Sequence, residues 1–155
     1  MKKMLLLFSH VISLVTGFAA GIYLLPILTQ PPAPSQVVLE RAASESLYRG
    51  QFQREVKGSD PLHYGDGTFY ISERAITFSG RLAPGPDYHL YLSPVFIETK
   101  ADFLQKKAQM VQVGEVRTFN NFIVALPADI DAADFNSAIV WCETFSMFIT
   151  AGRYQ

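Results

Sequence analysis

The sequence holds few side chains that could carry out metal or redox chemistry: one cysteine and three histidines. Imidazole nitrogens and thiolate sulfurs are ligands that haem iron, copper and zinc accept. A lone cysteine could also act as a redox-active thiol. The four residues are His10, His63, His89 and Cys142. Their spacing matches no metal-binding motif, so they form a site only if the fold brings them together, and the sequence does not name a metal.

Cys142 lies in an apolar run, Ala138–Glu143, that is typical of a central β-strand. Side chains alternate along a strand, so the run has two faces: Ala138, Val140 and Cys142 on one, Ile139 and Trp141 on the other. On this pattern alone Cys142 is a small buried hydrophobe, the common state of a free cysteine. An unpaired thiol is nonetheless uncommon in an exported domain, so a redox or ligand role stays open.

The histidines differ in their surroundings. His89 lies in a predicted strand, on the face that Tyr91 shares and opposite Tyr88. His63 precedes a predicted turn at Gly65–Gly67. His10 lies within a long apolar segment, where a single polar side chain is tolerated without a function. The candidate ligands are therefore His63, His89 and Cys142.

Several common functions are excluded by what the sequence lacks. There is no glycine-rich phosphate loop, no H-E-x-x-H motif, no pair of cysteines and no G-x-S-x-G motif. The net charge is -1, which does not attract nucleic acid. The chain is therefore expected to be a redox or binding module rather than a stand-alone enzyme.

The N-terminal segment predicts a membrane anchor. No charged residue occurs from Met4 to Leu28, and a helix of this length would rise roughly 37 Å, enough to cross a bilayer. Lys2 and Lys3 precede the segment, and the next charges are Glu40 and Arg41. The positive-inside rule then places the N-terminus in the cytoplasm and the rest of the chain outside.

A cleaved signal peptide is the alternative, because Gly17–Gly21 offers small residues to a peptidase. The apolar run continues past those residues to Leu28, which favours an uncleaved anchor. Asn120, Asn121 and Asn136 are not in glycosylation sequons. We therefore expect a single-pass protein of a bacterial inner membrane, with its domain in the periplasm.

The rest of the chain predicts one β-domain after a spacer. Residues 1–29 form the anchor, residues 30–47 a proline-rich stalk and juxtamembrane segment, and residues 48–155 the domain. Short β-branched and aromatic segments alternate with turn residues, which is typical of an antiparallel β-sandwich of about eight short strands. The expected strands are Tyr48–Glu55, Thr68–Ser72, Ala75–Gly80, Tyr88–Ser93, Val111–Val113, Phe122–Leu126, Ala138–Glu143 and Met147–Ala151. Lys100–Ala108 and Asp131–Phe135 are expected to be short helices.

Several segments together resemble the DM-thirteen domain, a small extracellular β-sandwich family related to the DOMON domains. They are Gly50-Gln51-Phe52, Gly85-Pro86-Asp87-Tyr88-His89-Leu90-Tyr91-Leu92, Leu126-Pro127 and Trp141-Cys142-Glu143-Thr144-Phe145. His63 and Gly67 match the family pattern loosely. Residues 114–122 depart from it, because they carry two asparagines where the family has a longer glycine-bearing strand.

The resemblance implies a role in electron transfer with an unknown redox partner. In that role the cysteine, here Cys142, acts as a bare redox thiol or helps to hold a prosthetic group such as haem, with His89 and His63 as partners. The competing hypothesis is a binding or scaffold module that recognises a small ligand or a partner protein, with Cys142 as packing. A third is an intermolecular disulfide through an exposed Cys142.

Overall fold

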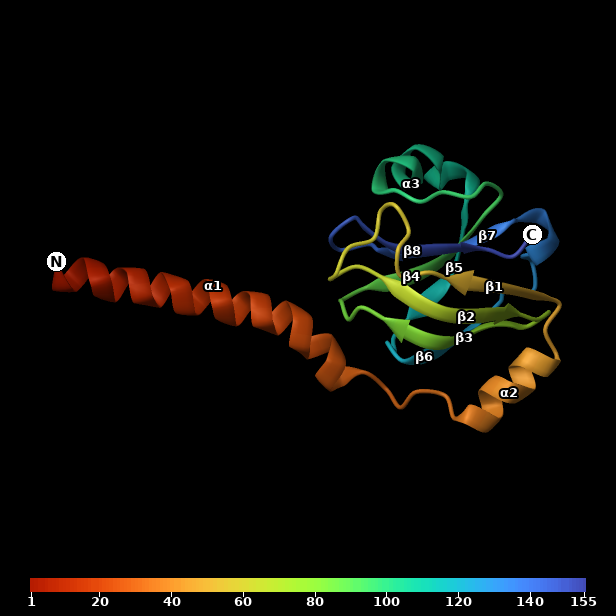
Figure 1. The fold of residues 1–155 in the computed structure, drawn as a ribbon, viewed down its shortest axis with the longest axis horizontal. Coiled ribbons are helices and arrows are strands. Elements are labelled where there is room, and N and C mark those ends of the chain that lie inside the picture. The colour runs from red at the N-terminus through yellow and green to blue at the C-terminus, as the bar shows by residue number, and fades with distance from the viewer.

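The computed structural model describes residues 1–155 and shows a β-sandwich from which one long helix projects (Figure 1). Two four-stranded antiparallel sheets face each other, with strand orders β1-β2-β3-β6 and β5-β4-β7-β8. The strands are β1 (Tyr48–Phe52), β2 (Gly65–Ile71), β3 (Ala75–Leu82), β4 (Tyr88–Ser93), β5 (Val111–Val116), β6 (Asn121–Ala125), β7 (Ser137–Cys142) and β8 (Met147–Arg153). The predicted fold, an eight-stranded antiparallel sandwich after an apolar helix, is confirmed.

The helices lie outside the sandwich. They are α1 (Lys2–Thr29), α2 (Gln36–Ser44) and α3 (Lys100–Lys106), with 3-10 turns at Lys107–Gln109 and Ala132–Asp134. In α2, Leu39 is buried, and this helix contacts β3. In α3, Thr99 caps the first turn because its side chain accepts a hydrogen bond from the Asp102 backbone N–H. Both short helical pieces of the domain occur where the sequence predicts them.

The two faces of the second sheet bury two separate clusters. Twenty buried residues fill the space between the sheets, including Tyr88, Val140 and Cys142. Eight more, including Tyr91, Phe103 and Trp141, pack between the outer face of the second sheet and the segment that carries α3. Every residue of β7 is buried for this reason. The alternation predicted for this strand, with Cys142 and Trp141 on opposite faces, is confirmed.

Three local predictions are wrong, and the first is the end of β1, which lies at Phe52 rather than at Glu55. Gly65–Gly67 is not a turn but the first part of β2, where Gly67 pairs with Gly80 of β3. Both glycines have positive φ, +147° and +159°, which other residues rarely adopt, so the glycines permit a strand rather than break it. Likewise β5 continues past the predicted end at Val113 to Val116, with a bulge between Leu90 and Tyr91 of its partner β4.

The edge strands β1 and β8 belong to different sheets and come very close at two glycines. A Cβ on Gly152 would lie 2.1 Å from the Gln51 carbonyl oxygen, and one on Gly50 would lie 2.5 Å from the Arg153 carbonyl oxygen. Any other residue at these positions would push the strands apart. The approach brings the two sheets together along one side of the sandwich.

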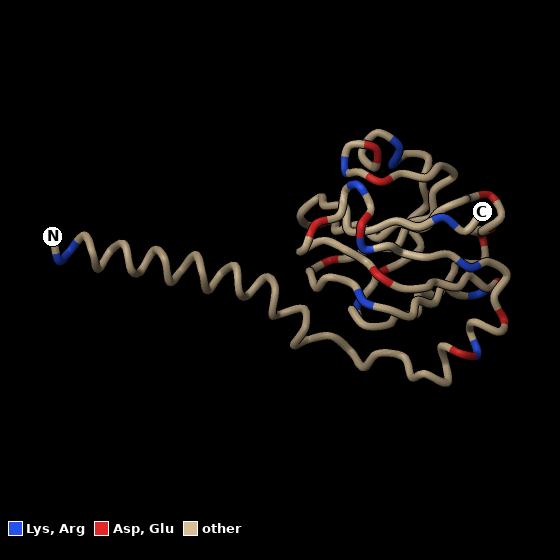
Figure 2. The backbone as a smooth tube through the Cα atoms, in the orientation of Figure 1, with Lys and Arg blue, Asp and Glu red and all other residues tan.

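Helix α1 is 28 residues long, apolar, and buries none of its residues in the protein. Its length and mean hydropathy of 2.1 suit a membrane span. Figure 2 shows charged positions only at its free end, where Lys2 and Lys3 lie. The other end meets the domain: Ile27 packs against the inter-sheet core, and the Gln30 side-chain oxygen accepts a 3.4 Å hydrogen bond from the Phe119 backbone N–H.

Candidate functional site

Cys142 is the last residue of β7, at one end of the sandwich. It pairs with Tyr88 of β4 and Met147 of β8, and it is 2% exposed. Its Sγ donates a hydrogen bond to the Pro86 carbonyl oxygen at 3.0 Å. Pro86 belongs to the turn that precedes β4, so the thiol is fixed between that turn and the inter-sheet core.

A cavity of about 460 Å³ lies beside this thiol, and nine of its thirteen lining residues are hydrophobic. We call it the helix–domain cavity, because Ala19, Ile22 and Tyr23 of α1 form one wall. His63 and Cys142 both line the opposite side, although 79 residues separate them in the sequence. The structure therefore brings two of the three predicted site residues to one apolar space.

His63 is held in place by Asp60. Its Nδ1 lies 2.8 Å from Asp60 Oδ2, while Asp60 Oδ1 accepts the backbone N–H groups of Leu62 and His63 at 2.7 and 2.9 Å. The hydrogen bond from His63 is the main cause that lowers the pKa of the Asp60 carboxyl, so this group is ionised and can only accept. Nδ1 therefore donates this hydrogen bond, and in the neutral form of the ring Nε2 keeps a lone pair.

His89 lies on the other face of the second sheet. It pairs with Trp141, and its ring nitrogens contact Asp87 Oδ1 at 3.0 Å and Gln112 Nε2 at 2.8 Å. The structure thus separates His89 from Cys142. His10 lies in α1, where its Nδ1 contacts the Leu6 carbonyl oxygen at 2.7 Å.

A polar network that the sequence did not reveal connects this outer face to α3. The Tyr91 hydroxyl donates to Glu143, and both carboxylate oxygens of Glu143 lie 2.8 Å from Lys107 Nζ. Burial would raise the pKa of the Glu143 carboxyl, but the hydrogen bonds from Lys107 and Tyr91 hold it below its usual value. The alternation along β4 predicts that Tyr91 lies on this face. No sequence pattern indicates that Glu143 pairs with Lys107, which is 36 residues away. The network fastens the end of α3 to the sheet.

The Cys142 thiol keeps its proton at neutral pH. Burial raises the pKa of the thiol above its ordinary value, and the negative charges of Asp87 and Glu143 add to this effect, while backbone N–H groups oppose it. A thiol in this state is a weak nucleophile, because the thiolate is the reactive form.

We expect folded Cys142 to react with Ellman's reagent at pH 7 far more slowly than Cys142 in urea, as measured by the release of the coloured thiol. Because the pKa is raised in the folded state, Cys142 contributes stability below the ordinary pKa of 9.0 and loses that contribution as the pH rises above it. Equal reaction rates with and without urea would contradict the buried, protonated state.

The residues that line the cavity show whether the haem that the resemblance implies fits this chain. His63 suits an iron ligand, because Asp60 orients its ring and leaves Nε2 free. Cys142 fits poorly, since its Sγ is buried and is directed at the Pro86 carbonyl oxygen. No group of three or more His, Cys, Asp or Glu side chains is placed to hold a metal ion. A haem held between His63 and Cys142 therefore does not fit.

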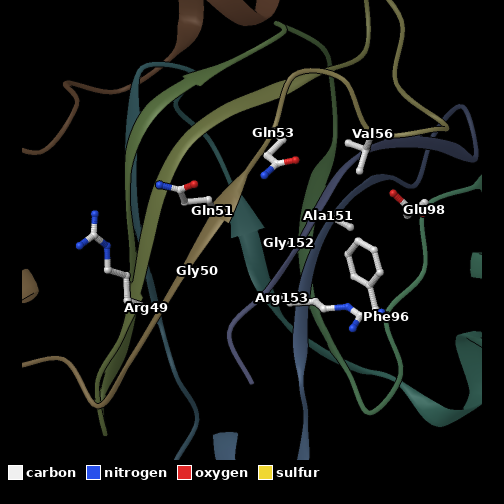
Figure 3. Close-up of a pocket in the computed structure, with 10 residues that line it drawn as sticks. All are labelled: Arg49, Gly50, Gln51, Gln53, Val56, Phe96, Glu98, Ala151, Gly152 and Arg153. Atoms are coloured by element: carbon white, nitrogen blue, oxygen red, sulfur yellow. The ribbon is translucent and has the colours of Figure 1, made fainter.

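A second hollow, of about 530 Å³, lies over the glycine approach of β1 and β8 (Figure 3). Its lining is mainly polar and includes Arg49 and Arg153. Figure 3 shows the two guanidinium groups pointing in different directions, and that of Arg153 lies 4.6 Å from the centre of the Phe96 ring. The charged groups do not converge on a common point, so the helix–domain cavity remains the candidate site.

Comparison with known proteins gives one match. The model of a family described as "Electron transfer DM13" matches residues 56–154, more than half of the chain. No curated protein and no solved structure matches. The matched residues include His63, His89 and Cys142 and extend from the first half of the β1–β2 connection to just past the end of β8.

Proposed function

Because the chain belongs to the DM13 family of electron-transfer domains, we propose that it is a membrane-tethered redox module whose redox-active group occupies the helix–domain cavity. The observation that carries the proposal is the meeting of Cys142 and His63 in this cavity. Its volume lies within the range of about 300–1,000 Å³ that is usual for ligand sites. Its walls are mainly apolar, which lowers the local dielectric constant and strengthens polar contacts made against them.

The tether follows from α1. The two lysines at its free end favour an N-terminus in the cytoplasm. The domain then faces the periplasm of a bacterial inner membrane, and the redox partner reaches it either there or within the membrane. The contacts of Ile27 and Gln30 with the domain support a sandwich held close to the membrane surface rather than far from it.

The test is voltammetry of the full chain purified in lipid nanodiscs. We expect a reversible redox wave from the unaltered protein, and we expect Cys142→Ala and His63→Ala to remove or shift it, because both change the walls of the cavity. A visible and ultraviolet spectrum before and after dithionite identifies the group that is reduced.

His89→Ala is the matched control, since it removes an imidazole from the opposite face of the sheet. The wave should survive this change at its original potential. If the unaltered chain shows no wave, or if the wave is the same in Cys142→Ala and His63→Ala, the proposal is wrong.

A binding or scaffold module is the second candidate, and the protonated, hydrogen-bonded thiol favours it. In that case Cys142 only packs, and Cys142→Ala changes stability but no redox property. An intermolecular disulfide does not fit the structure, because the thiol is 2% exposed and faces the interior.

A further inference from the structure

Polar atoms inside the helix–domain cavity indicate what kind of molecule it takes. In the neutral form of the His63 ring, Nε2 is a hydrogen-bond acceptor, because Nδ1 donates to Asp60. Tyr88 is 3% exposed, lines the cavity, and can donate or accept through its hydroxyl. The Cys142 thiol already donates its hydrogen bond to the Pro86 carbonyl oxygen. The cavity thus offers an acceptor and a hydroxyl within walls that are otherwise mainly apolar.

The position of the cavity indicates how the molecule reaches it. Ala19, Ile22 and Tyr23 lie six to ten residues before the end of α1 at Thr29, which corresponds to about 9–15 Å along the helix. This part of α1 belongs to the apolar segment that suits a membrane span. Leu62 and Phe145 also line the cavity and are 62% and 47% exposed, so the rim on the domain side is apolar too. A ligand can therefore enter from the bilayer.

We propose that the helix–domain cavity binds the ring of a membrane-dissolved quinol. This inference rests on the proposed redox function and names the class of molecule that occupies the cavity. One quinol hydroxyl donates to His63 Nε2, and the other hydroxyl bonds with the hydroxyl of Tyr88. The ring lies against the apolar walls, and the isoprenoid tail follows α1 into the bilayer.

The His63 imidazole, which is oriented by the Asp60 carboxylate, favours a quinol over a lipid acyl chain as the ligand. An acyl chain would leave His63 Nε2 and the Tyr88 hydroxyl without partners in an apolar space, which costs free energy for each group. A quinol satisfies both. In its neutral form, with Nδ1 protonated, the ring of His63 accepts a hydrogen bond from a quinol but repels the carbonyl oxygen of a quinone, so the cavity should then prefer the reduced form.

The test is calorimetric titration of the full chain in nanodiscs with decylubiquinol under argon, with empty nanodiscs as the blank. We expect saturable binding, weaker binding of decylubiquinone, and a loss of about tenfold in affinity for His63→Ala, the size expected for one buried hydrogen bond. Tyr88→Phe keeps the ring and should cost about threefold to tenfold. His89→Ala should bind as the unaltered chain does. Circular dichroism checks that each variant is folded.

Three outcomes would overturn the inference: no saturable binding, equal affinity of His63→Ala and the unaltered chain, or equal affinity for decylbenzene, which has no oxygen atoms and would indicate an acyl-chain site. A redox wave without quinol binding would overturn this inference and leave the proposed function in place. Quinol binding in a chain that shows no redox wave would support this site and overturn the redox function.

Discussion

Replacing Trp141 with alanine should lower the free energy of unfolding by about 3–5 kcal/mol, the cost typical of a buried tryptophan. Trp141 is 1% exposed, and its ring is stacked on Phe103 of α3 with 3.9 Å between the ring centres and 8° between the planes. The stack is the centre of the smaller cluster, so its loss releases α3 from the sheet. Trp141 is the only tryptophan, so urea unfolding must be followed by circular dichroism.

Leu104→Ala is the control for this experiment, because Leu104 lies on the same helix but is 53% exposed. Its effect should stay within about 0.5 kcal/mol, as for most surface changes. If Trp141→Ala cost no more than Leu104→Ala, α3 would not be fastened to the sheet through this stack.

Exchanging residues 1–29 for a cleavable export signal should move nearly all of the protein from the membrane fraction to the soluble periplasmic fraction. The reason is that α1 supplies the whole of the proposed tether. Alkaline washing of membranes followed by immunoblotting measures the distribution. The exchanged chain also loses Ala19, Ile22 and Tyr23, so its cavity lacks one wall. Its affinity for a quinol should therefore be lower than that of the unaltered chain.

The mass of the intact, unaltered protein decides between an anchor and a signal peptide. A retained anchor gives the mass of the full chain. A mass lower by the first 20 or so residues would show cleavage near Gly17–Gly21 and would contradict the tether.

Much of the sheet could be predicted from the sequence, because each strand carries its own local pattern. The alternation in Ala138–Cys142 correctly separates Cys142 from Trp141, and that in Tyr88–Leu92 separates Tyr88 from Tyr91. Glycines are misleading where two of them face each other: the pattern predicts a turn at Gly67 and the end of a strand at Gly80, yet they pair inside β2 and β3. The local pattern cannot show that a glycine in one strand will meet a glycine in another.

The site could not be predicted because it depends on which strands become neighbours. In an antiparallel pair, opposite residues share a face, so the register that pairs Tyr88 with Cys142 also pairs His89 with Trp141 and moves His89 away from the thiol. No local signal fixes that register. His63 reaches the same cavity as Cys142 only because of the path of the loop that carries it. The α1 residues line this cavity only because the end of the helix packs against the domain. Neither arrangement can be seen in the sequence.

The close approach of β1 and β8 at Gly50 and Gly152 also bears on how the protein behaves among copies of itself. An open sheet edge is a template for aggregation, because its free N–H and C=O groups can pair with a strand from another molecule. Here the two edges approach each other at these positions, and only glycine allows them so near. The proposed tether would confine many copies to one surface and raise their local concentration, so an edge that is blocked at these glycines would protect the domain where encounters between copies are most frequent.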